Sequence, residues 1–103
     1  MQNLNRPRIL FVDDEPDILR SLERIARKVD AEILTAESGK LALEIINDTP
    51  VDVIVSDMKM PHMTGNELLK EVARITPETV RIVLTGYSDM EMVFSAVNEG
   101  HIW

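Results

Sequence analysis

The chain has 103 residues, a formal net charge of −7 and a hydrophobic fraction of 45%. This length supports one domain with a single core, and no internal repeat or linker divides it. The acidic balance argues against direct nucleic acid binding, because phosphate backbones select basic surfaces. The sequence has no cysteine, which excludes disulfides, thiolate zinc sites and thiol nucleophiles.

Membrane and export signals are also missing from the sequence. No apolar run approaches the roughly 20 residues that span a bilayer. The first residues, Met1 to Arg6, lack the apolar core of a signal peptide. We therefore expect a cytoplasmic protein without a membrane partner.

The first expected strand, residues 8–12, is almost entirely apolar, which is typical of a central strand covered on both faces. The acids Asp13, Asp14 and Glu15 follow it directly. Asp14 or Glu15 is expected to cap the next helix, with Pro16 in its first turn. The buried stripe of this helix is expected to consist of Ile18, Leu19, Leu22, Ile25, Ala26 and Val29.

The next elements are a weaker strand and a second amphipathic helix. Residues 32–36 are more polar, so we place this strand at an edge of the sheet. Ser38 is expected to cap a helix that ends near residues 47–50. Its apolar face is expected to contain Leu41, Ala42, Ile45 and Ile46.

The third expected strand, residues 51–56, ends at Asp57, and a loop with Pro61 and Gly65 follows. Taken alone, Asp57 is as typical of a turn start as of a site. Thr64 and Glu67 have the spacing of a capping box, which predicts that a third helix begins there. It is expected to end at residues 76–77.

The last expected elements are a buried fourth strand at residues 80–84 and a fourth helix that Ser88 and Glu91 cap and Gly100 ends. The full order is βαβαβαβα with the start of one more strand. Short crossovers imply parallel pairing with right-handed connections, hence a doubly wound α/β sheet. Since parallel strands end at the same edge, the acids after the first and third strands should meet there.

The sequence resembles the receiver domain of bacterial two-component response regulators in three features. These are the acids just named, the spacing from Asp57 to Gly65, and the fourth-strand ending Leu84-Thr85-Gly86-Tyr87. The resemblance covers the whole chain. It implies a flavodoxin-like fold with strand order 2-1-3-4-5. It also implies that a histidine kinase or phosphotransfer protein phosphorylates Asp57, and that the domain switches an effector domain without turning over an independent substrate.

The resemblance further implies Mg²⁺ as cofactor, with Asp13, Asp14, Asp57 and the backbone carbonyl of Lys59 as ligands. Two carboxylates about 5 Å apart repel by roughly 3 kcal/mol at an effective dielectric near 20, so a cation is required before a phosphoryl group arrives. Magnesium suits carboxylates and phosphoryl oxygens. Thr85 is expected to contact the phosphoryl group and start the switch. Lys59 and Tyr87 are candidates for tuning dephosphorylation.

The sequence departs from the family at its end. The family's fifth strand carries an aromatic and a lysine and precedes a fifth helix, whereas this chain stops at Trp103. We therefore interpret residues 1–103 as a C-terminally incomplete receiver domain, lacking most of the fifth strand and the fifth helix. The exposed fourth strand and the fourth helix are then expected to mediate self-association.

One alternative interpretation remains open, and two others do not fit the sequence. A haloacid dehalogenase-type phosphatase would have two acids with one residue between them after the first strand. A flavodoxin would have a glycine- and hydroxyl-rich loop at the same place. The segment Asp13-Asp14-Glu15-Pro16 fits neither pattern. The runner-up is a non-phosphorylated protein-interaction module or inactive fragment with a receiver-like fold. His62 is expected neither to bind metal nor to accept a phosphoryl group.

Overall fold

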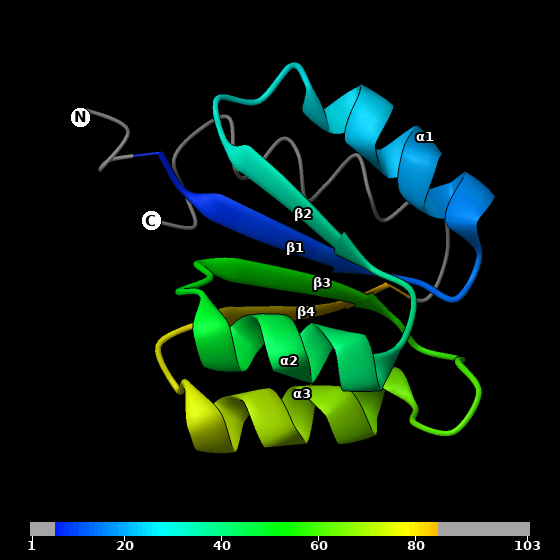
Figure 1. Cartoon of the computed structure of the whole chain (residues 1–103), viewed down its shortest axis with the longest axis vertical. Coiled ribbons are helices and arrows are strands. Elements are labelled where there is room, and N and C mark those ends of the chain that lie inside the picture. Colours follow the sequence, from blue (N-terminus) through cyan, green and yellow to red (C-terminus); the bar gives the residue numbers. More distant parts are fainter. Residues whose placement is uncertain (1–5, 85–103) are drawn as a thin grey trace.

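The computed structural model describes residues 6–84. Strands and helices alternate along this stretch, with the bounds β1 (Arg8–Val12), α1 (Pro16–Ala26), β2 (Glu32–Ala36), α2 (Gly39–Asp48), β3 (Val53–Asp57), α3 (Gly65–Ile75) and β4 (Val80–Leu84). The strands are parallel and lie in the order β2-β1-β3-β4. Figure 1 shows α1 on one face of the sheet and α2 and α3 on the other. The predicted doubly wound sheet is confirmed.

The central position of β1 follows from its apolar sequence. Residues Ile9 to Val12 are at most 1% exposed. Ile9 and Phe11 belong to the core under α1, whereas Leu10 and Val12 belong to the core under α2 and α3. Successive strand residues face opposite sides of a sheet, so a continuous apolar run fits a strand covered on both faces. The more polar β2 lies at an edge, as its sequence predicts.

Two helix starts match their sequence signatures. The Ser38 hydroxyl accepts a hydrogen bond from the Leu41 N–H at 3.1 Å. Thr64 and Glu67 form the reciprocal capping box, with distances of 3.2 and 2.9 Å. The α1 start differs: Glu15 occupies the N-cap position, but its side chain makes no capping hydrogen bond. Glu15, one of the two expected residues, is thus the N-cap of α1 by position, but its side chain does not cap the helix.

The buried stripes of α1 and α2 are narrower than expected. Ile25 is 37% exposed and Leu41 is 46% exposed. The buried residues are Leu19, Leu22 and Ala26 in α1 and Gly39, Ala42 and Ile46 in α2, of which all but Gly39 belong to the predicted stripes. At 3.6 residues per turn, Ile25 and Leu41 point away from the centres of these buried faces and stay in contact with solvent. Val29 is buried as expected, but it follows the end of α1.

Two strand expectations also need correction. β3 begins at Val53 rather than at residue 51, although Val51 is buried. β4 is half-buried rather than buried, and Arg81 is exposed. Within residues 6–84, β4 pairs only with β3, so only one of its edges is covered.

The expected fourth helix and the start of a fifth strand lie outside the described residues. Self-association through this part of the chain therefore stays a prediction. Among the described helices, none is long and apolar enough to cross a membrane.

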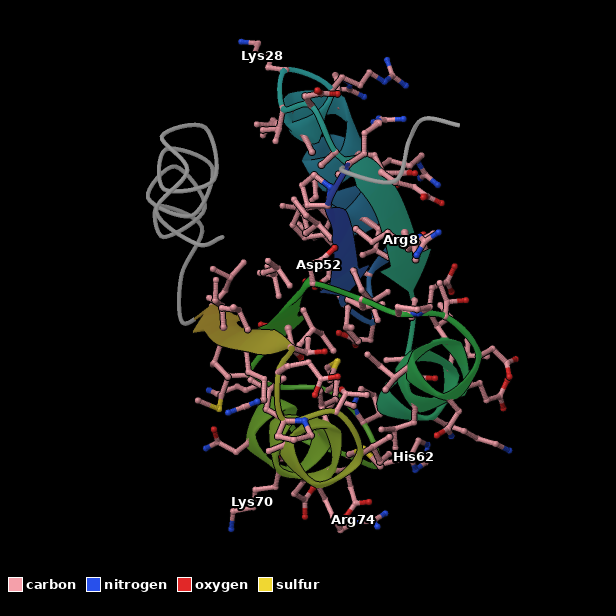
Figure 2. All side chains as sticks on the ribbon, turned by 90° about the vertical axis from the view of Figure 1, so that its left-hand side faces the viewer. Arg8, Lys28, Asp52, His62, Lys70 and Arg74 are labelled. Carbon is pink, nitrogen blue, oxygen red and sulfur yellow. The ribbon has the colours of Figure 1, made fainter. Side chains whose placement is uncertain are left out.

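The amino-terminal ends of the strands are held by charged groups. The Arg8 N–H donates to Asp52 at 2.8 Å, and the Arg8 guanidinium pairs with Glu32 at 2.9 Å and donates to the Pro50 carbonyl at 3.2 Å. Figure 2 looks onto this end of the sheet, where Arg8 and Asp52 lie, and shows Lys70 and Arg74 pointing outward from α3. These contacts of Arg8 connect the start of β1 with the starts of β2 and β3.

The start of β4 is fixed to the start of β3 by a buried hydroxyl. Thr79 is 2% exposed, and its Oγ1 donates to the Val51 carbonyl at 2.7 Å. The same oxygen lies 3.0 Å from the Thr76 hydroxyl. Thr79 was not singled out by sequence pattern, because a threonine between a helix and a strand is common in turns.

Thr79→Val should lower the free energy of unfolding by about 1–3 kcal/mol, because it keeps the shape but leaves the buried Val51 carbonyl without its donor. Chemical denaturation measures this loss. Thr79→Ser keeps the hydroxyl and should be less destabilising than Thr79→Val. The reverse order would show that the methyl group, not the hydrogen bond, matters at this position.

Candidate functional site

Three carboxylates meet at the carboxyl edge of the sheet. Asp13 and Asp14 follow β1, and Asp57 is the last residue of β3. β1 and β3 are neighbours in parallel register, with Val12 opposite Ser56, so the acids emerge side by side. One oxygen from each of Asp13, Asp14 and Asp57 lies within 4.8 Å of the others. The strands end on the same side in Figure 1.

The surroundings of Asp13 shift the pKa of its carboxyl group. Burial raises its pKa above the ordinary value, and the negative charges of Asp57, Asp14 and Glu15 raise it further. The Glu15 backbone N–H opposes this by donating to the Asp13 carboxylate at 2.9 Å. The ionised form of Asp13 is therefore destabilised in the folded chain, and a nearby cation would relieve that cost.

The chain leaves β3 through a tightly packed segment. The Gly65 N–H donates to the Met58 carbonyl at 2.9 Å. A Cβ added at Gly65 would lie 2.3 Å from the Asp57 carbonyl oxygen, so no larger residue fits without moving the backbone. The glycine in the sequence pattern thus has a steric reason: α3 begins against the backbone of Asp57.

The loop between these residues contains a strained turn. His62 has a φ of 70°, in the left-handed region that non-glycine residues rarely adopt. Around it, the Met63 N–H donates to the Pro61 carbonyl at 2.7 Å. Met63 packs against Gly39 at the start of α2, where an added Cβ would meet its sulfur at 2.6 Å. His62 itself is exposed and is not part of the acidic group.

An open cleft of about 510 Å³ gives access to the acids, and it is lined by Asp14, Glu15, Asp57, Met58, Lys59 and Leu84. Within residues 6–84, no N–H or O–H group donates a hydrogen bond to the carbonyl oxygen of Lys59. This oxygen is thus free of the described backbone and fits the expected role of a ligand. Thr85 and Tyr87 lie outside the described residues, but the preceding Leu84 is paired with Asp57.

One residue near the site was missed by sequence reasoning. Ser56 is completely buried in β3, and its hydroxyl donates to the Asp57 carbonyl at 2.9 Å. Its signal in the sequence is a single hydroxyl directly after the aliphatic segment from Val53 to Val55. That signal is weak because serine also ends many strands.

The donor set fits a magnesium ion. Mg²⁺ prefers carboxylate and carbonyl oxygens and keeps several waters, which an open cleft can admit. The group offers three carboxylates with one oxygen each within 4.8 Å of the others, with no cysteine or histidine among them. Its partly buried Asp13 has a raised pKa that a cation would lower again.

Comparisons with known proteins give one consistent result. The chain is 43% identical over 97 residues to the hydrogenase transcriptional regulatory protein HoxA of Cupriavidus necator, a match that covers 92% of this chain and 20% of HoxA. The chain spans about a fifth of the length of HoxA and of the transcriptional regulatory protein GlrR of Escherichia coli.

Solved structures agree. The response regulator receiver domain protein of Clostridium thermocellum shares 36% identity at a TM-score of 0.74, over 91% of this chain and 76% of that one. The signal receiver domain of an HD domain-containing protein from Pseudomonas fluorescens Pf-5 shares 33% identity at a TM-score of 0.77, over 96% and 79%.

The family profile of the response regulator receiver domain matches residues 9–102, almost the whole chain. The parallel sheet order and the acids at its carboxyl edge agree with that match. The chain therefore belongs to the response regulator receiver domain family.

Proposed function

We propose that Asp57 accepts a phosphoryl group from a histidine kinase or phosphotransfer protein, and that the resulting change controls an output domain. The observation that supports this most strongly is the group of three carboxylates within 4.8 Å, placed beside an open cleft in a member of the receiver family. Asp57 is the member of the group that ends the central strand β3 and lines the cleft.

Asp57 serves as the nucleophile in this proposal. One carboxylate oxygen forms a P–O bond as the bond from phosphorus to the donor imidazole nitrogen breaks, and that nitrogen keeps the electron pair. The transfer requires alignment and charge stabilisation more than covalent assistance. Rigid backbone contacts around Asp57 supply the alignment, because its carbonyl packs against Gly65 and accepts from Ser56.

Asp13, Asp14, Asp57 and the carbonyl of Lys59 would hold Mg²⁺, which when bound neutralises the negative charge that gathers at the site. Asp13 is also held in place by the Glu15 N–H. Thr85 contacts the phosphoryl group in this proposal and starts the switch. Lys59, which lines the cleft, and Tyr87 tune water access and dephosphorylation.

The relatives suggest the setting of this chemistry. HoxA and GlrR are described as transcriptional regulatory proteins, and the chain matches about a fifth of each. We infer that this domain is attached to, or acts on, a separate output domain in the cytoplasm. It modifies itself and turns over no independent substrate.

Asp57→Asn should abolish phosphorylation by acetyl phosphate in the presence of Mg²⁺, because it removes the nucleophile and retains the shape. Intact-protein mass spectrometry measures the phosphorylated fraction. Asp48→Asn is the matched control, since Asp48 is an exposed acid at the end of α2 and should leave labelling unchanged. An unlabelled wild-type chain would favour the alternative of a non-phosphorylated interaction module.

Mg²⁺ should stabilise the wild-type fold. At about ten times its dissociation constant, a ligand that binds only the folded state adds about 1.4 kcal/mol to the free energy of unfolding. Thermal unfolding with and without Mg²⁺ measures this effect. Asp14→Ala should reduce the response, and an equal response in this variant would contradict its role as a ligand.

Asp13→Asn should raise the unfolding temperature at pH 7 without Mg²⁺. The raised pKa means that the folded chain holds this proton more tightly than the unfolded chain does, so ionisation of Asp13 weakens folding as the pH rises through that pKa. The gain should shrink as the pH falls toward the ordinary aspartate pKa of about 3.9. A gain that does not depend on pH would point to altered packing instead.

A further inference from the structure

Ser56 and Thr79 are the two buried polar residues within the described part of the chain. Their hydrogen bonds lie near opposite ends of β3. Thr79 donates to the carbonyl of Val51, just before the strand, and Ser56 donates to the carbonyl of Asp57, its last residue. The two hydroxyls therefore make the same kind of bond, one far from the acidic group and one next to it.

The Asp57 carbonyl is confined from two directions. The Ser56 hydroxyl donates to it at 2.9 Å, and Gly65 packs so closely that a Cβ there would approach it to 2.3 Å. The following carbonyl, of Met58, accepts from the Gly65 N–H at 2.9 Å. Two successive peptide groups are thus fixed between the proposed nucleophile and Lys59.

This confinement has a geometric consequence. The peptide between Asp57 and Met58 can rotate only if the Ser56 bond breaks or α3 shifts. A change in the ψ angle of Asp57 would turn this peptide and move the Lys59 carbonyl, two residues further along, relative to the Asp57 side chain. Small displacements matter here, because a misplacement of about 1 Å can cost about a hundredfold in rate.

We infer that Ser56 is a positioning residue for the phosphorylation site: its hydroxyl holds the Asp57 peptide so that the carboxylate and the Lys59 carbonyl face one point. This rests on the proposed function of Asp57. The rival explanation is that the bond merely satisfies a buried hydroxyl, as the Thr79 bond does. The two explanations differ in what is lost when the hydroxyl is removed.

The test compares Ser56→Ala with Thr79→Val in the same chain. Each variant removes one buried hydroxyl that donates to a backbone carbonyl. Ser56→Ala should weaken Mg²⁺ binding severalfold, measured by titration calorimetry without a phosphodonor, and should slow labelling by acetyl phosphate about tenfold. It should also speed hydrogen exchange of the Gly65 amide. Thr79→Val should lower stability but leave all three readouts at wild-type values.

Two further variants guard against a folding failure. Ser56→Thr restores the donor and should recover Mg²⁺ affinity, whereas Ser56→Cys keeps the size with a weaker donor and should fall between wild type and Ser56→Ala. If Ser56→Ala loses stability but keeps wild-type Mg²⁺ affinity and labelling rate, the inference is wrong and the proposed function stands. If the wild-type chain neither binds Mg²⁺ nor becomes labelled, both fail.

Discussion

The parallel register between β1 and β3 is the constraint on which the site depends. Val12 lies opposite Ser56, so the residues that follow each strand emerge together at one edge. A slip of one residue would turn every side chain of β3 to the other face of the sheet. Ile54 and Val55 are buried in different cores, one under α2 and α3 and one under α1. Core packing on both faces therefore sets where the carboxylates meet.

The acidic group works against the stability that the cores provide. Its three carboxylates lie within 4.8 Å, and Asp13 is partly buried, so ionisation there is opposed by desolvation and by like charge. Such a group persists when the backbone around it is held by other contacts. The Gly65 packing and the Ser56 and Glu15 hydrogen bonds provide those contacts. A cation would then bind a group that already has its geometry, at little cost in ordering.

The sequence predicts most accurately the structural features that depend on one local physical rule. The apolar run of β1 predicts a central strand, and the Ser38 and Thr64 signatures predict helix starts, because each depends on local chemistry. Which helix residues are buried at the edge of an apolar face depends on how much of the helix the sheet covers. The predicted burial of Ile25 and Leu41 is therefore wrong. The Ser56 bond depends on a neighbouring carbonyl and on α3, which no local pattern encodes.

The two ends of the sheet differ in how their charges are compensated. At the amino ends, the Arg8 guanidinium pairs with Glu32, and the Arg8 backbone N–H donates a hydrogen bond to Asp52. The acids there therefore already have partners. At the carboxyl ends, Asp13, Asp14 and Asp57 form no ion pair with any residue of the described part, residues 6–84. Exposed pairs add little stability, so this difference matters more for binding than for folding. The acids that form no ion pair within residues 6–84 would attract a cation from solution, and Asp57 lines the cleft at this edge.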